Sequence, residues 1–179
     1  MKLIYLIGLP GSGKTTVMKE FISEYEWKYD KPIDLLDTQV SGNIRLLGKY
    51  EEGETFSGTD RLSMAVAPKA IEYFKTKPNE VVIGEGDRLN NKAFFDCFED
   101  KVIIYLSVSD QERERRYAER GSEQSDKFIK TVQTKCKNIL EEYGDKQTVF
   151  GEEEGCVIEF VHETSEDTKK VIDFIKNSI

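Results

Sequence analysis

The sequence predicts an α/β fold, a three-layer sandwich in which a mostly parallel five-stranded sheet lies between two layers of helices. Short apolar segments alternate with longer segments of helical periodicity, which is the pattern of a parallel sheet covered on both faces. The first apolar segment runs directly into a glycine-rich loop and then a helix. The length of 179 residues allows one domain with a substantial core, so we expect residues 1–179 to form a single domain.

Six segments are strand candidates because they are short, apolar and bounded by turn residues. In chain order they span residues 2–7, 33–37, 43–50, 81–84, 101–108 and 156–161. The second and third are expected to pair through the turn at Ser41-Gly42. The others are separated by helical segments, which favours parallel pairing.

Helices are expected between and after these strands. In chain order they span residues 16–27, 60–75, 91–98, 110–143 and 166–179. The second contains Pro68, which predicts a kink because proline removes a helical hydrogen bond. The fourth is highly charged and is expected to break near Gly121-Ser122.

The composition limits the class of protein. A net charge of −8 argues against broad electrostatic attraction to nucleic acid. No apolar run is long enough to span a bilayer, so no membrane partner is expected. A strand at residue 2 leaves no room for a signal peptide, and three scattered cysteines indicate free thiols. We therefore expect a cytoplasmic protein, either a monomer or a homodimer.

A phosphate-binding P-loop motif, G-x-x-x-x-G-K-T, follows the first strand and opens the first helix. Its glycines let several backbone N–H groups converge on one anion, and the helix N-terminus adds further donors. Lys14 is expected on the β and γ phosphates and Thr15 on Mg²⁺. The nucleotide-binding residues expected are Gly8, Pro10, Gly11, Ser12, Gly13, Lys14, Thr15 and Thr16. ATP or GTP with Mg²⁺ is the ligand that this motif predicts, and ATP is our choice.

Four acidic residues are candidates for the chemistry beside this loop. Glu85, with Asp87 as the alternate, follows the strand at 81–84, where P-loop enzymes hold Mg²⁺. Asp37 and Asp60 are nearly equal candidates for a general base that accepts the proton of an attacking hydroxyl. Asp60 also suits the purely structural role of a helix N-cap.

Arginines form a second group of candidates. Arg113, Arg116 and Arg120 share one face of the segment at 110–143 by their spacing. This segment is either a lid in which Arg116 and Arg120 stabilise charge on the transferred phosphate, or a solvated face of ion pairs. Arg61 and Arg88 are expected to hold the acceptor, although Arg61 also suits a surface ion pair.

Two kinds of residue are left without a firm role. The only histidine, His162, follows the last strand and is expected to be exposed or to cap a helix. Three aromatic residues, Tyr50, Phe56 and Phe94, either stack on an acceptor base or belong to the core.

Taken together, the P-loop, the acid at the end of the strand and the arginine lid resemble the P-loop nucleotide and nucleoside kinases over nearly the whole chain. Residues 48–50, 56–63 and 85–88 are similar to bacteriophage kinases, among them the 5-hydroxymethyluracil DNA kinases, which phosphorylate the base hydroxymethyl group within DNA. The resemblance implies transfer of the ATP γ-phosphate to a nucleoside-type hydroxyl. The best candidate acceptor is 5-hydroxymethyluracil in phage DNA, in the host cytoplasm. The alternatives are a small-molecule nucleotide or nucleoside kinase and a regulatory P-loop ATPase.

Overall fold

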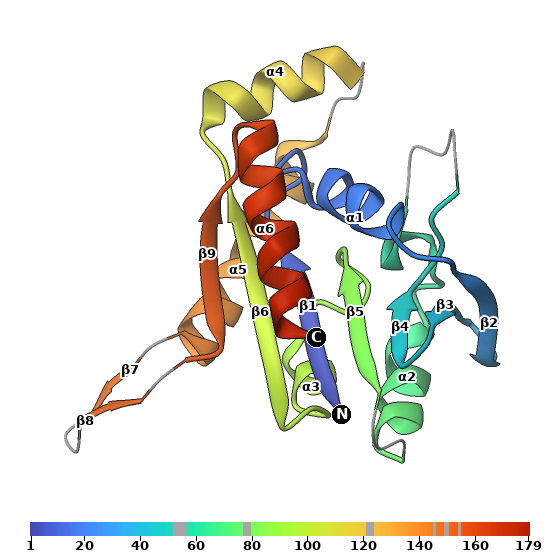
Figure 1. Ribbon diagram of the computed structural model, residues 1–179. Coiled ribbons are helices and arrows are strands. Elements are labelled where there is room, and N and C mark those ends of the chain that lie inside the picture. The colour runs from blue at the N-terminus through green and yellow to red at the C-terminus, as the bar shows by residue number, and fades with distance from the viewer. Residues whose placement is uncertain (52–56, 77–79, 121–123, 145, 149–150, 154) are drawn as a thin grey trace.

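The computed structural model describes residues 1–51, 57–76, 80–120, 124–144, 146–148, 151–153 and 155–179, with only the backbone for 120, 146–148 and 151–153 (Figure 1). The strands are β1 (Lys2–Ile7), β2 (Lys28–Ile33), β3 (Leu36–Ser41), β4 (Ile44–Leu47), β5 (Val81–Glu85), β6 (Asp100–Ser107), β7 (Lys146–Thr148), β8 (Gly151–Glu153) and β9 (Val157–Val161). The α-helices are α1 (Lys14–Ile22), α2 (Val66–Phe74), α3 (Lys92–Phe95), α4 (Asp110–Arg120), α5 (Asp126–Tyr143) and α6 (Ser165–Ser178).

The main sheet has the strand order β2-β3-β4-β5-β1-β6-β9. Neighbours from β4 to β9 pair in parallel, whereas β2, β3 and β4 pair antiparallel. Strands β7 and β8 form a separate two-stranded ribbon. The predicted α/β class with a mostly parallel sheet is therefore confirmed. The main sheet is larger than expected, with seven strands among the described residues instead of five.

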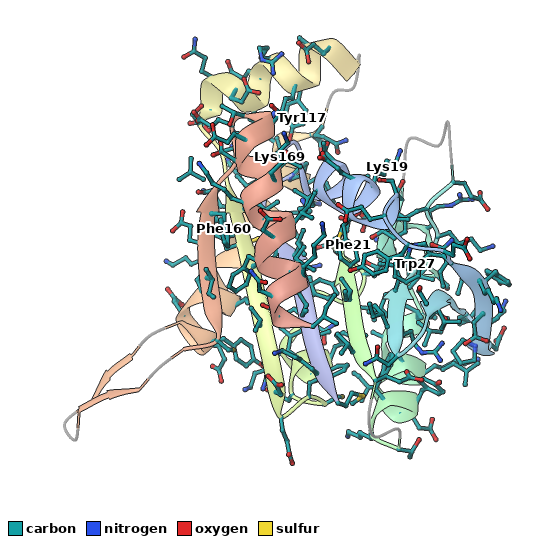
Figure 2. All side chains as sticks on the ribbon, viewed as in Figure 1. Lys19, Phe21, Trp27, Tyr117, Phe160 and Lys169 are labelled. Atoms are coloured by element: carbon teal, nitrogen blue, oxygen red, sulfur yellow. The ribbon has the colours of Figure 1, made fainter. Side chains whose placement is uncertain are left out.

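Strand β2 corresponds to none of the six strand candidates, because residues 28–32 were left between the predicted helix at 16–27 and the strand candidate at 33–37. Its Pro32 is tolerated because β2 is an edge strand, where a missing N–H need not reach a neighbour. Helix α1 ends earlier than expected, at Ile22, whose carbonyl accepts a hydrogen bond of 2.9 Å from the indole of Trp27. The rings of Phe21 and Trp27 lie 6.4 Å apart beneath this bend (Figure 2).

Alternation of side chains along β1 divides the core between the two faces of the sheet. Leu3, Tyr5 and Ile7 pack with residues of α2, α3 and α5 on one face. Ile4 and Leu6 pack with residues of α1 and α6 on the other. Figure 1 shows α6 and α1 in front of the sheet and α5 behind it, so both faces are covered as a buried parallel sheet requires.

Two helix expectations need correction. The expected helix at 60–75 is a 3₁₀ turn at Thr59–Arg61 followed by α2, which begins at Val66. Pro68 therefore lies in the first turn of α2, where its missing N–H removes no helical bond, and it produces no kink. The charged segment forms two helices, α4 and α5, but the expected break at Gly121-Ser122 lies outside the described residues.

The carboxyl ends of the parallel strands meet at one edge of the sheet, the upper edge in Figure 1, beneath α4. The P-loop follows β1 at this edge, and Glu85 is the last residue of the neighbouring β5. Within the described part of the chain, no helix combines the length and apolar character needed to cross a membrane.

Candidate active site

A cleft of about 630 Å³ opens at the carboxyl edge of the sheet. It brings together the P-loop, Asp60, Glu85 and Asp87, which are far apart in the sequence. The residues that line it are Ile7, Gly8, Pro10, Gly11, Gly13, Lys14, Thr15, Thr16, Lys19, Ser57, Asp60, Glu85, Gly86, Asp87, Asn90, Tyr117, Gln124, Phe128 and Val132. The lining includes the predicted P-loop residues, Asp60, Glu85 and Asp87, together with residues of α5 that were not predicted.

The P-loop has a backbone that only glycine accommodates easily. Gly11 and Gly13 have φ angles of 82° and 95°, which other residues rarely adopt. A Cβ on Gly13 would also lie 2.2 Å from Cε1 of His162. Lys14 Nζ donates hydrogen bonds of 2.9 and 3.1 Å to the carbonyls of Gly8 and Leu9. The side chain of Lys14, the first residue of α1, therefore reaches back across the loop to its first two residues.

Thr15 and Glu85 form the second feature of the cleft. The Thr15 hydroxyl donates a hydrogen bond of 3.0 Å to Glu85 Oε1. Glu85 is 1% exposed, and this burial raises the pKa of its carboxyl group to about 7, although Lys14 and the Thr15 hydrogen bond act in the opposite direction. A hydroxyl and a buried carboxylate oxygen are ligands that suit Mg²⁺. In the described residues no group of three His, Cys, Asp or Glu side chains forms a metal site, so phosphate and water oxygens would complete the shell.

Asp60 and Asp87 lie beside this pair. Asp60 Oδ1 accepts a hydrogen bond of 2.8 Å from the backbone N–H of Asp87. Gly86, with a φ of 108°, permits this approach because a Cβ there would lie 2.9 Å from Asp60 Oδ1. Asp87 Oδ2 forms an ion pair of 2.7 Å with Lys135 on α5. Asp60 therefore borders the cleft with one carboxylate oxygen already bonded.

Asp37 is not among the residues that line the cleft. It is the second residue of β3, an antiparallel strand, and does not end a strand as expected. Its carboxylate accepts a hydrogen bond from Tyr29 and lies within ion-pair distance of Lys31 and Lys49.

The two arginines expected on the acceptor side also lie outside the cleft lining. Arg61 Nη1 forms an ion pair of 2.6 Å with Glu51. Arg88 Nε donates a hydrogen bond of 3.3 Å to the carbonyl of Leu62. Arg61 follows Asp60 directly in the chain, and Arg88 bonds to the next residue, Leu62.

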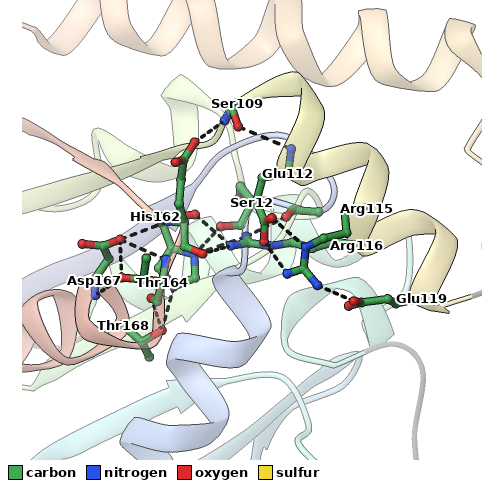
Figure 3. A network of polar contacts seen from close by, with 12 residues as sticks. Ser12, Ser109, Glu112, Arg115, Arg116, Glu119, His162, Thr164, Asp167 and Thr168 are labelled. Carbon is green, nitrogen blue, oxygen red and sulfur yellow. Dashed lines mark hydrogen bonds and ion pairs between the residues drawn. The ribbon is translucent and has the colours of Figure 1, made fainter.

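Arg116 projects from α4 to the outer side of the P-loop (Figure 3). Its guanidinium donates hydrogen bonds of 3.0 Å to the carbonyls of Gly11 and His162 and one of 3.3 Å to that of Glu163. It also pairs with Glu112 at 2.8 Å. Arg116 thereby joins α4, the P-loop and the end of β9, while the side chain of Arg120 lies outside the described residues.

His162 is buried, contrary to the expectation of an exposed or capping residue. Its Nδ1 lies 2.9 Å from the carbonyl of Ser12, and its Nε2 lies 2.8 Å from the hydroxyl of Thr168 (Figure 3). Because a carbonyl can only accept, Nδ1 carries the proton and Nε2 accepts from Thr168. Burial and then the charge of Arg116 lower the pKa of His162. A neutral imidazole therefore holds the P-loop against α6.

The wall of the cleft that α5 contributes was not predicted from the sequence. Phe128 and Val132 lie four residues apart and border the cleft. Their helical spacing was visible in the sequence, but nothing local distinguishes a cleft wall from a core face. Among the aromatic candidates, Phe94 belongs to the core, Tyr50 packs against the core cluster on the other face of the sheet, and Phe56 lies outside the described residues.

Comparison with known proteins identifies the family of the chain. No curated protein matches the chain. The model of one family, P-loop Nucleotide Kinase3, matches residues 1–175. This match covers the P-loop, Glu85, Asp60 and both helices of the charged segment. The chain therefore belongs to the P-loop nucleotide kinase 3 family.

Proposed function

We propose that the protein transfers the γ-phosphate of ATP to a hydroxyl group of a nucleoside-type acceptor. The observation that carries the proposal is the cleft that unites the P-loop, the Thr15–Glu85 pair and Asp60. Phosphoryl transfer is achieved mostly by positioning and charge stabilisation, and these groups supply both.

Each group of residues in the cleft has its own role in the proposed transfer. The P-loop N–H groups and Lys14 hold the phosphates. Thr15 and Glu85 would hold Mg²⁺, with Asp87 as the alternate ligand, and the bound ion would neutralise phosphate charge. The acceptor oxygen forms a bond to the γ phosphorus while the bond from that phosphorus to the β–γ bridging oxygen breaks, releasing ADP.

A general base takes the proton of the acceptor hydroxyl, and Asp60 suits this role better than Asp37. Asp60 borders the cleft, whereas Asp37 does not and is surrounded by Tyr29, Lys31 and Lys49. We propose that Arg116 holds the P-loop in its phosphate-binding shape through Gly11, and that Arg61 and Arg88 support the acceptor side.

For the acceptor, the resemblance of residues 48–50, 56–63 and 85–88 to phage DNA kinases favours 5-hydroxymethyluracil in DNA. A screen with γ-labelled ATP tests this directly. Plain DNA, DNA containing 5-hydroxymethyluracil, free nucleosides and nucleoside monophosphates are the acceptors. Label in the modified DNA alone supports the DNA acceptor, and label in free nucleosides or nucleotides supports a small-molecule kinase. Release of phosphate that no acceptor changes would contradict phosphotransfer and indicate an ATPase.

Replacing Lys14 with Ala tests the donor side. The phosphates lose the only charged group that the P-loop contributes, so we expect turnover to fall by about 10²-fold or more, by analogy with other electrostatic groups. Lys137→Ala is the matched control because that lysine is 72% exposed on α5. Equal activity of the two variants would contradict the assignment of the P-loop.

A further inference from the structure

Two buried oxygen atoms, on residues that line the cleft, have no role in the proposed phosphoryl transfer. Ser57 and Asn90 are 3% and 5% exposed. In the described structure, Ser57 Oγ and Asn90 Oδ1 make no hydrogen bond. Buried polar atoms are nearly always paired because water can no longer satisfy them. These two atoms therefore indicate a partner that the protein itself does not supply.

Both atoms belong to residues that line the cleft beyond the P-loop. Ser57 precedes the 3₁₀ turn that carries Asp60, and Asn90 follows the segment of Glu85 and Asp87. They thus come from the two segments that flank the proposed general base. A ligand bonded to them lies on the acceptor side of the cleft.

The α5 wall of the cleft is apolar. Phe128 is 40% exposed, although it is a large aromatic residue, and Val132, four residues later on α5, is buried. Both side chains line the same cleft as Ser57 and Asn90. An accessible aromatic ring beside a small number of fixed polar groups is the arrangement that recognises a nucleobase, through stacking on its face and hydrogen bonds to its edge.

We propose that Ser57 and Asn90 form the polar edge, and Phe128 and Val132 the stacking wall, of a subsite for the nucleobase of the acceptor. The base offers N–H groups to Ser57 Oγ and Asn90 Oδ1, and its reacting hydroxyl points toward Asp60. This inference rests on the proposed function and extends it, because it assigns residues that select the acceptor.

Calorimetry on the full chain, with Mg²⁺ and a non-hydrolysable ATP analogue present, tests the subsite. The probes are the four 2′-deoxynucleosides and 5-hydroxymethyl-2′-deoxyuridine, with 2-deoxyribose as the probe that lacks a base. At least one nucleoside is expected to bind and 2-deoxyribose is not. Absence of binding by every nucleoside, or equal binding of 2-deoxyribose, would overturn the subsite.

Substitutions at the proposed contact residues then test which side chains bind the nucleoside. Ser57→Ala and Asn90→Ala should each weaken nucleoside binding about tenfold, since each loses one buried hydrogen bond. Phe128→Leu should weaken it as well, whereas Phe128→Tyr retains the ring and should not. Val161→Ala, which removes an apolar side chain that is 62% exposed on β9, is the matched control. If Asn90→Ala does not fold, Asn90→Leu, which keeps the branched shape but has no accepting oxygen, takes its place.

The outcomes separate this inference from the proposed function. Weaker binding of the ATP analogue with unchanged nucleoside binding would place the donor base on this wall and overturn the inference. If an acceptor is phosphorylated and its KM is the same in all variants, the subsite is overturned while the kinase function stands. If nucleoside binding depends on Ser57, Asn90 and Phe128 but no acceptor is phosphorylated, the subsite is supported and the kinase function is contradicted.

Discussion

At the scale of single residues, the burial of the Glu85 carboxyl group lowers the stability of the fold at high pH, and the same residue is a proposed metal ligand. Its pKa of about 7 lies above the ordinary value of 4.5, so the folded protein keeps a proton that the unfolded chain releases. The resulting contribution to stability is complete below about pH 4.5 and is lost as the pH rises through about 7. At pH 8 the ligand-free protein therefore contains an ionised carboxylate in a buried position.

Replacing Glu85 with Gln should raise the melting temperature of the ligand-free protein at pH 8, by about 2–4 °C for each kcal/mol of relief. The same change should abolish most turnover because a ligand of the proposed metal site is lost. Thermal unfolding at pH 5 and pH 8, together with an activity assay, measures both effects. Exposed Glu159→Gln on β9 is the control. A variant that is less stable than the wild type at pH 8 would contradict the charge argument.

Asp60 and Asp37 offer a second comparison between single residues. Asp60→Asn should lower kcat by about 10²–10⁴-fold with little change in the KM for ATP, because the acceptor hydroxyl loses its base. Asp37→Asn should leave kcat near the wild-type value, since Asp37 does not line the cleft. Steady-state kinetics of both variants give the two kcat values. A larger loss of kcat in Asp37→Asn than in Asp60→Asn would assign the base to Asp37.

At the scale of secondary-structure elements, the P-loop is supported from outside by α4 and by the end of β9. Arg116 reaches the carbonyls of Gly11 and His162, and His162 reaches that of Ser12. Arginine can bridge several carbonyls because its donors form a planar fork, which a lysine ammonium does not offer. These contacts connect α4 to the proposed nucleotide site although α4 is distant from the P-loop in the sequence.

Arg116→Lys should therefore raise the KM for ATP, by about tenfold if one net hydrogen bond to a charged group is lost. Arg115→Lys is a matched control on the same helix, because Arg115 is 56% exposed and pairs with Glu112 and Glu119 on α4 itself. Nucleotide titrations of both variants provide the measurement. Equal KM values in the two variants would show that Arg116 is only a surface ion pair.

At the scale of the whole molecule, binding of ATP should couple distant parts of the chain. The cleft is lined by the P-loop, the segment around Asp60, the end of β5 and helix α5. A ligand that binds only the folded protein at 100 times its Kd stabilises it by about 2.7 kcal/mol.

MgATP at that concentration should therefore raise the melting temperature by roughly 5–10 °C, at 2–4 °C for each kcal/mol. Adenosine, which lacks phosphates, should have little effect, and Lys14→Ala should lose most of the shift. A thermal shift assay with the three samples gives the measurement. A similar shift with adenosine would mean that the P-loop contributes little to binding.

The elements that were predicted correctly are those specified by contiguous residues. The P-loop is one continuous motif, and β1, β5 and β6 are apolar runs whose burial follows from their composition. Strand β2 was missed because an edge strand with Pro32 has no apolar pattern. Its place depends on pairing with β3, which is a contact between segments and not a property of either.

By itself the sequence determined the fold class, the phosphate-binding loop and the acid at the end of β5, because each depends on local geometry and short-range pattern. Only the tertiary structure decided that Asp60 and not Asp37 borders the cleft, that His162 is a buried support of the P-loop, and that Phe128 provides a wall. These outcomes depend on strand order, strand direction and helix packing. Such features arise from contacts between distant segments, whose energies no local pattern of residues reveals.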